Sequence, residues 1–118
     1  MNREEDSIQM AIVQYLEIKK HFYYSIPNEA IGAGKNKQQA AARGHKLKLM
    51  GRRAGVADLF IYWAFGGNAY LEVKSKVGKQ SKAQKQFEKD VLARGHEYFI
   101  VRSVDDVIEL EKKLRGSK

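Results

Sequence analysis

The alternation of apolar and polar residues along the chain predicts four helices and four strands. Apolar residues at helical spacing mark the helices, and short runs of aromatic and β-branched residues mark the strands. The predicted helices cover residues 3–20, 35–53, 81–94 and 103–115, and the predicted strands cover residues 21–26, 58–63, 70–75 and 97–102. The order α-β-α-β-β-α-β-α predicts an α/β fold with a central mixed β-sheet flanked by helices.

The two central strands carry charged residues that a buried strand would normally exclude. Asp58 opens the first of them, and Glu72 and Lys74 lie on the second. Because strand side chains alternate, Glu72 and Lys74 share one face. A two-residue turn at Gly66-Gly67 would make Asp58 face away from Glu72. Bringing the two carboxylates together therefore requires an odd-length loop, a bulge or splayed strands.

Two carboxylates and an ammonium group at one sheet edge suit a divalent cation and a phosphate. Carboxylate oxygens are ligands for Mg²⁺, which keeps several water molecules for chemistry. Lys74 can orient such a water or offset charge that builds on the phosphate. The alternative is a solvated polar face on an antiparallel sheet, and a Glu-x-Lys pattern taken alone favours that alternative.

Length, composition and charge narrow the class of protein. At 118 residues the chain is expected to form one domain spanning residues 1–118. No apolar run approaches the length of a membrane span, and the acidic N-terminus does not resemble a signal peptide. The absence of cysteine excludes disulfides and thiolate metal sites, and is compatible with the cytoplasm. A net charge of +8 suggests a polyanionic partner.

The segment from residue 35 to residue 53 carries cations and no acidic residue. A solvated helix face would normally mix the two signs, so charge of one sign favours phosphate binding. Few aromatic or amide side chains lie between these cations, which predicts contacts to the DNA backbone rather than to bases. Asn28 could contact a phosphate as well, although turn formation after Pro27 explains it equally. The predicted DNA-binding cations are Lys35, Lys37, Arg43, Lys46, Lys48, Arg52 and Arg53.

Two further side chains, Glu5 and Gln84, have structural explanations at the starts of helices. Glu5 lies in the first turn of the first helix, where the helix dipole favours carboxylates, and Glu4 beside it has the same property. Gln84 completes the pattern Ser81-x-x-Gln84, which is typical of a capping box.

Several short motifs together resemble the VRR-NUC branch of the PD-(D/E)XK nucleases, over nearly the whole chain. The motifs are Glu5-x-x-Ile8-Gln9, Pro27-Asn28-Glu29, Gly55-Val56-Ala57-Asp58-Leu59-Phe60, Tyr70-Leu71-Glu72-Val73-Lys74-Ser75, Gly78-Lys79-Gln80-Ser81 with Gln84, and Val101-Arg102-Ser103. One position departs from the family pattern, because Ala57 stands where the family usually has proline.

The resemblance implies a restriction-endonuclease-like core and a metal-dependent DNA endonuclease. It implies that Asp58, Glu72 and the Val73 carbonyl hold Mg²⁺ or Mn²⁺, with Glu5, or failing that Glu4, completing the metal site as a further ligand or supporting it. It places Lys74 beside the attacking water and makes Gln84 an accessory residue.

By resemblance to stand-alone phage members, which act in the host cytoplasm, the expected substrate is branched DNA such as a four-way junction. Symmetrical cutting of a junction implies a homodimer. The alternative is a non-catalytic basic DNA- or RNA-binding module that keeps the segment 35–53 and does not use the carboxylates.

Overall fold

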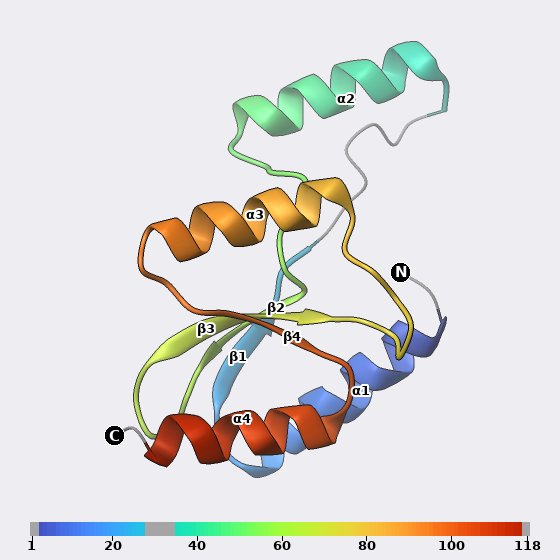
Figure 1. Cartoon of the computed structure of the whole chain (residues 1–118). Coiled ribbons are helices and arrows are strands. Elements are labelled where there is room, and N and C mark those ends of the chain that lie inside the picture. The colour runs from blue at the N-terminus through green and yellow to red at the C-terminus, as the bar shows by residue number, and fades with distance from the viewer. Residues whose placement is uncertain (1–2, 28–34, 117–118) are drawn as a thin grey trace.

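A mixed four-stranded sheet forms the centre of the molecule (Figure 1). The structure is a computed structural model that describes residues 3–27 and 35–116, so Asn28 lies outside the described residues. The strands are β1 (Phe22–Ser25), β2 (Leu59–Tyr62), β3 (Asn68–Val73) and β4 (Tyr98–Val101). Their order is β1-β2-β3-β4, with β1 and β3 antiparallel to β2 and with β4 parallel to β3. The predicted α/β fold with a central mixed sheet is confirmed.

Helices cover the two faces of this sheet unequally (Figure 1). The helices are α1 (Arg3–Ile18), α2 (Lys37–Leu49), α3 (Lys82–Ala93) and α4 (Val104–Gly116). Helices α1 and α4 lie on one face and α3 lies over the other, while α2 lies beyond α3, away from the sheet. No other helix or strand of the described chain packs closely against α2.

The core lies between the sheet and the helices α1 and α4. Alternate residues of the strands point to this side, as the alternation of strand side chains requires. The fully buried side chains here include Ile12 and Leu16 from α1, Leu59 and Leu71 from the sheet, and Val107 from α4. The opposite face of the strands carries aromatic and acidic residues, so the two faces of the sheet have different chemistry.

The loop between β2 and β3 has an odd number of residues. The N–H of Trp63 donates to the Gly67 carbonyl at 2.9 Å, and Tyr62 pairs with Asn68. Three residues, 64–66, therefore connect the two hydrogen-bonded strands. The same register pairs Leu59 with Leu71, which sets Asp58 opposite Glu72 on one face. The structure thus meets the first of the three conditions under which the carboxylates can converge.

The elements lie where they were predicted, with bounds that differ by at most a few residues, and the differences at α2 and β3 have identifiable causes. Helix α2 is shorter than predicted, because Asn36 caps its N-terminus and Gly51 follows it with a φ of +93°. Lys35 therefore precedes the helix, and Arg52 and Arg53 follow it. Strand β3 begins at Asn68, two residues before the predicted strand 70–75, because the turn closes between Trp63 and Gly67.

Candidate active site

Asp58 is buried at the start of β2 and is tied to the neighbouring strand. Its Oδ2 accepts a hydrogen bond of 2.7 Å from the backbone N–H of Val73. Burial raises the pKa of the Asp58 carboxyl, and the nearby charge of Glu5 raises it further, while the Val73 hydrogen bond and Lys74 oppose the change. An ionised Asp58 is therefore unfavourable in this place unless a cation compensates it.

Gly55 brings the chain into Asp58 along the first turn of α3. It has a φ of +81°, and a Cβ at this position would lie 2.4 Å from the backbone of Ala83. Glycine is therefore required both by the backbone conformation and by the close approach. This contact places the start of β2 next to the turn that carries Gln84.

Glu72 is completely buried, with 0% of its surface exposed, and its two oxygens have different surroundings. The hydroxyl of Tyr98 and the Nε2 of Gln80 both donate to Oε1, the second at 3.3 Å. Oε2 is buried and accepts no hydrogen bond, and it lies 3.8 Å from the Nζ of Lys74. Burial is the largest cause that raises the pKa of this carboxyl, and the charge of Asp58 adds to it.

Gln84 holds the Lys74 ammonium next to the Oε2 of Glu72. The buried Nζ of Lys74 donates to the Oε1 of Gln84 at 2.8 Å. The same Oε1 accepts the backbone N–H of Ser81 at 2.8 Å, and the N–H of Gln84 donates to the Ser81 hydroxyl at 3.1 Å. Gln84 therefore completes the capping box and contacts Lys74 at the same time, because one oxygen serves both.

Glu5 on α1 contacts the loop after β3, although the two segments lie far apart in the sequence. Its Oε2 accepts the N–H of Ser75 at 3.3 Å, and Glu4 accepts the N–H of Lys76 at 3.1 Å. A Cβ on Gly78 would lie 3.1 Å from the same Glu5 oxygen, so the loop after β3 passes close to this carboxylate. Of the two acidic residues, Glu5 is the one whose charge raises the pKa of Asp58.

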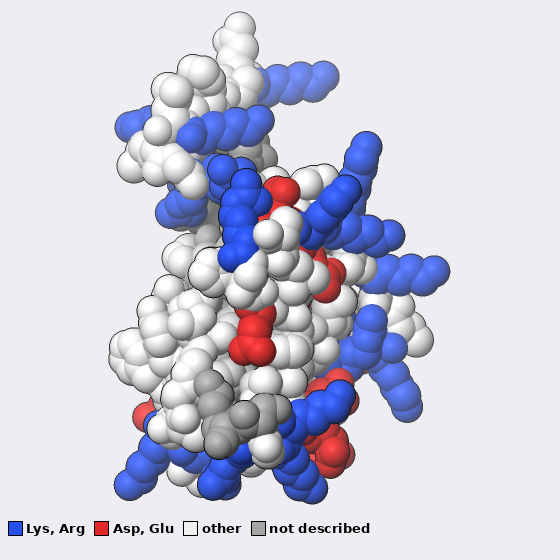
Figure 2. Space-filling model, turned by 60° about the vertical axis from the view of Figure 1, so that its left-hand side comes forward, with Lys and Arg blue, Asp and Glu red and all other residues white. Residues whose placement is uncertain are grey.

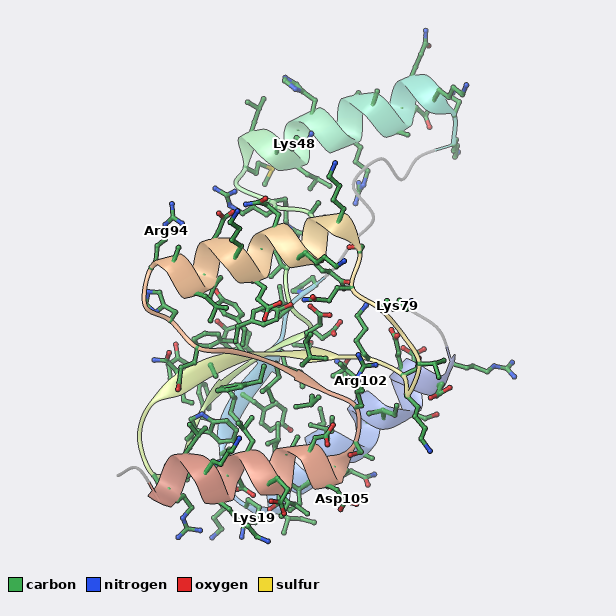
Figure 3. All side chains as sticks on the ribbon, in the orientation of Figure 1. Lys19, Lys48, Lys79, Arg94, Arg102 and Asp105 are labelled. Atoms are coloured by element: carbon green, nitrogen blue, oxygen red, sulfur yellow. The ribbon has the colours of Figure 1, made fainter. Side chains whose placement is uncertain are left out.

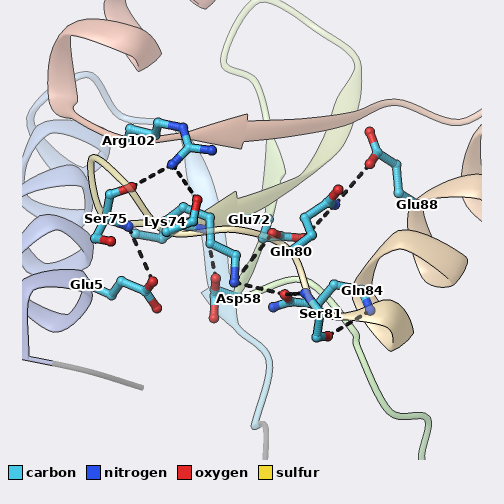
Figure 4. A network of polar contacts seen from close by, with 12 residues as sticks. Glu5, Asp58, Glu72, Lys74, Ser75, Gln80, Ser81, Gln84, Glu88 and Arg102 are labelled. Atoms are coloured by element: carbon cyan, nitrogen blue, oxygen red, sulfur yellow. Dashed lines mark hydrogen bonds and ion pairs between the residues drawn. The ribbon is translucent and has the colours of Figure 1, made fainter.

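Arg102 forms hydrogen bonds with the backbone of the loop that follows β3 (Figures 3 and 4). Its Nη1 donates to the carbonyls of Ser75 at 2.6 Å and Gly78 at 2.8 Å. This loop carries Gln80, whose Nε2 also donates to Glu88 on α3 at 2.9 Å. The backbone on both sides of Lys74 is therefore held at several points.

The predicted residues Asp58, Glu72, Lys74, Gln84 and Glu5 thus lie together at the ends of β2 and β3 (Figure 4). The Val73 carbonyl is expected to face the Asp58 side, since the N–H and C=O of one strand residue point toward the same neighbour. Over residues 3–27 and 35–116, no three His, Cys, Asp or Glu side chains form a ready metal cluster.

The available donors nevertheless fit a hard divalent cation. Glu72 has a buried oxygen that accepts no hydrogen bond. Burial disfavours the ionised form of both Asp58 and Glu72 and so raises the pKa of each carboxyl. Oxygen ligands from two carboxylates and one carbonyl, completed by water, are the set that Mg²⁺ commonly takes. A bound cation would offset the repulsion between Asp58 and Glu72.

Three residues of this network had no predicted role. Gln80 and Arg102 belong to motifs quoted above, but their partners are carboxylate and carbonyl groups that only the folded chain brings near. Tyr98 reaches Glu72 because β4 runs parallel to β3, with Tyr98 level with Tyr70. Its sequence signal was weak, because a tyrosine in an apolar strand is equally typical of a core position.

The predicted DNA-binding cations lie apart from the carboxylates. All seven are exposed, on α2 or beside its ends. Lys and Arg side chains project from the end of the molecule that α2 forms (Figure 2). Lys48, Arg52 and Arg53 line a groove of about 920 Å³ between the end of α2, α3 and the β2–β3 hairpin. The structure therefore gathers these three cations along one concave surface.

The fold and the site together define an α/β domain of the restriction-endonuclease-like type, with its acidic residues at the ends of two adjacent strands. Its structure is similar to a solved "VRR_NUC domain", with a TM-score of 0.66 and 20% sequence identity over 94% of this chain and 97% of that one. It is similar as well to a "VRR_NUC domain protein", with a TM-score of 0.64 and 22% identity over 92% of this chain and 84% of that one. The chain therefore has the fold of VRR_NUC domains, as its motifs predicted.

No protein-family model matches the sequence, and no curated protein matches it. None of the helices in the described ranges is long and apolar enough to cross a membrane.

Proposed function

We propose that this protein is a Mg²⁺- or Mn²⁺-dependent DNA endonuclease of the VRR-NUC family. The observation that carries the proposal is the buried Oε2 of Glu72, which accepts no hydrogen bond, lies 3.8 Å from the Nζ of Lys74 and stands across the hairpin from Asp58. The similarity to solved VRR_NUC domains supports it.

In this proposal Asp58, Glu72 and the Val73 carbonyl hold the cation. When bound, the cation supplies Lewis-acid activation of the phosphate and lowers the pKa of a water molecule. Lys74 orients the attacking water and offsets charge that develops on the phosphate oxygens. Gln84 keeps the Lys74 ammonium pointing into the site, and Glu5 supports the site through the backbone of Ser75.

The substrate in this proposal is branched DNA such as a four-way junction. The basic surface of α2 and the cations that follow it would contact phosphates, and Asn28, which lies outside the described residues, is proposed as a further phosphate contact. Symmetrical cutting of a junction needs two active sites, so the protein would act as a homodimer in the host cytoplasm. Light scattering of the free protein and of its junction complex tests this, and a monomer in both would favour a flap or nicking nuclease.

The central experiment compares linear, flapped and four-way DNA, labelled at one end and incubated with Mg²⁺, Mn²⁺ or EDTA. Cleavage should require the cation and should be lost in Glu72→Gln and Asp58→Asn, while DNA binding remains. Lys74→Ala should reduce turnover but keep cation binding. An exposed carboxylate on α4, Glu109, provides the matched control Glu109→Gln, which should cut like the wild type.

Binding without cleavage under every cation condition would contradict the nuclease proposal. That result would favour the alternative, a non-catalytic basic DNA- or RNA-binding module.

A further inference from the structure

The face of the sheet that carries Asp58 and Glu72 also carries an exposed row of aromatic rings. Phe22 is 67% exposed, Tyr24 is 48% exposed and Tyr62 is 42% exposed. Phe22 pairs with Tyr62 and Tyr24 pairs with Phe60 across β1 and β2, so the four side chains share one face. Exposed aromatic side chains gathered on one sheet face indicate a binding surface, because scattered apolar residues are ordinary but a contiguous patch is not.

The rings form a continuous surface rather than isolated side chains. Ring centroids lie 5.6 Å apart for Phe22 and Tyr62, 5.8 Å for Tyr24 and Phe60, and 5.1 Å for Phe60 and Tyr62. The row continues to Tyr70, whose ring centroid lies 4.8 Å from that of Phe60. Helix α3 covers only the Tyr70 end, through the contact of Tyr70 with Phe87, and leaves the β1 end open.

The row leads directly to the carboxylates. Phe60 follows Asp58 by two residues on β2, and Tyr70 precedes Glu72 by two residues on β3, so each pair shares a face. Same-face neighbours along a strand are roughly 7 Å apart. A nucleic-acid strand with one phosphate at the carboxylates would therefore have its adjoining nucleotides over the rings.

The charge beside the row favours a polyanionic occupant. The groove lined by Phe60 and Tyr70 is also lined by Lys48, Arg52 and Arg53. Arg94 also lines this groove, and so do the carboxylates of Asp90 and Glu97. The groove therefore has more cationic than anionic side chains. Aromatic faces next to a cationic groove are the combination by which proteins bind single-stranded nucleic acid, since bases stack on rings and cations follow the backbone.

We propose that Phe22, Tyr24 and Tyr62 form a stacking platform for the unpaired bases of single-stranded DNA next to the carboxylate site. This inference rests on the proposed nuclease function and narrows its branched substrate to DNA with unpaired nucleotides adjoining the cleaved phosphate, as in a flap, rather than a fully paired four-way junction. Fully paired DNA cannot use the platform, because its bases are stacked on one another.

The experiment measures fluorescence anisotropy of a labelled thymidine oligonucleotide and of a blunt duplex of equal length, both in EDTA. The test variant replaces the three exposed rings, as Phe22→Leu, Tyr24→Leu and Tyr62→Leu, and so keeps apolar side chains but removes the π faces. Its affinity for the oligonucleotide should fall by about tenfold or more, since stacking contributes roughly 1–3 kcal/mol per base. The loss should be confined to the single strand.

Two controls accompany the test variant. Phe22→Tyr, Tyr24→Phe and Tyr62→Phe together keep the rings and should restore single-strand binding. Met10→Ser and Ile18→Ser remove exposed apolar surface from α1, on the other side of the sheet, and should leave binding unchanged.

A 2-aminopurine base in the oligonucleotide should lose fluorescence on binding the wild type and not on binding the leucine variant.

Unchanged single-strand affinity in a folded leucine variant would overturn the inference. So would a change from dimer to monomer in light scattering with unchanged single-strand affinity, because a second copy would then be the occupant of the face. Binding in EDTA needs no cleavage, so ring-dependent binding without any cutting would defeat only the nuclease proposal. Cutting with ring-independent binding would defeat only the platform.

Discussion

The Asp58 carboxylate accepts a hydrogen bond of 2.7 Å from the backbone N–H of Val73, which ties it to the strand that carries Glu72. This bond uses Oδ2 and draws the carboxylate across the hairpin. On Glu72 the hydrogen-bond donors are confined to Oε1, and Oε2 has none. The hydrogen-bond donors around Asp58 and Glu72 are therefore placed so that the Oε2 of Glu72 accepts none of them, at the point where the two carboxylates converge.

The first prediction concerns the stability of the cation-free protein. Burial raises the pKa of both Asp58 and Glu72 above their ordinary values. Stability from such groups is fully present below the pKa of the unfolded chain, near pH 4, and is lost as the pH rises through the folded values. Glu72→Gln should therefore be more stable than wild type at pH 7 in EDTA, by on the order of 1 kcal/mol.

Urea denaturation from pH 4 to pH 8 checks this. The difference in unfolding free energy between Glu72→Gln and wild type should grow as the pH rises and then level off. A constant difference across the range would show that the carboxyl is not destabilising when ionised. Glu109→Gln, on the exposed side of α4, should show no such growth.

The second prediction is that divalent cations stabilise the folded protein. Binding to the native state alone stabilises it by about 2.7 kcal/mol at a concentration of 100 times Kd. For a domain of this size, each kcal/mol raises Tm by roughly 4 °C. Thermal denaturation in Mg²⁺ or Mn²⁺ should show the shift for wild type and not for Asp58→Asn. Equal shifts in both proteins would place the cation elsewhere.

The third prediction concerns Tyr98, which we expect to position Glu72 rather than to contact the substrate. Tyr98→Phe removes the hydroxyl that donates to Glu72 Oε1. Loss of such a supporting contact typically lowers metal affinity or activity 10- to 100-fold, so cation affinity should fall by about tenfold. Tyr23→Phe removes a hydroxyl that donates to Glu17 on the surface, and should leave affinity unchanged.

Isothermal titration with Mn²⁺ measures the affinities of these two variants. The circular dichroism spectrum of Tyr98→Phe should match that of wild type. A folded Tyr98→Phe protein with wild-type cation affinity would contradict the positioning role.

The fourth prediction separates the two uses of Gln84. Ser81→Ala removes the hydroxyl that caps α3 and should cost about 1 kcal/mol of stability, with the contact to Lys74 kept. Gln84→Ala removes both the capping oxygen and the partner of Lys74. Initial cleavage rates should therefore fall further in Gln84→Ala than in Ser81→Ala. Equal rates at equal stability would mean that Gln84 only caps the helix.

The fifth prediction concerns the cations on and after α2. Replacing Lys46, Lys48, Arg52 and Arg53 with alanine should weaken DNA binding about equally for all sequences. Each lost phosphate contact should reduce the slope of log affinity against log salt by roughly 0.9. Anisotropy in Ca²⁺, chosen to suppress cutting, measures the slope.

The control for this variant replaces Lys19 on the opposite side of the molecule from α2 (Figure 3). Lys19→Ala should leave the slope unchanged. If the fourfold variant also keeps the wild-type slope, the DNA runs elsewhere, past Lys76, Lys79 and Lys82.

Much of the fold followed from local pattern, because helix and strand periodicities are properties of neighbouring residues. Apolar residues at helical spacing indicated the helices, and the alternation through Glu72, Val73 and Lys74 indicated a strand with acidic and basic groups on one face. The boundaries were less accurate around α2, where Asn36 caps the start of the helix and Gly51 follows its end, inside a segment that carries cations throughout.

The convergence of the site was decided by tertiary structure. From the sequence, Asp58 could face Glu72 only with an odd-length loop, a bulge or splayed strands. The hydrogen bond between Trp63 and Gly67 in the folded chain shows that the loop has an odd number of residues. Glu5 and Tyr98 lie near the site because α1 packs its apolar side chains against the sheet and β4 pairs with β3, and the period of apolar residues does not say which elements pack together. The sequence by itself determined the elements and the chemical groups on them, whereas long-range burial decided which groups meet.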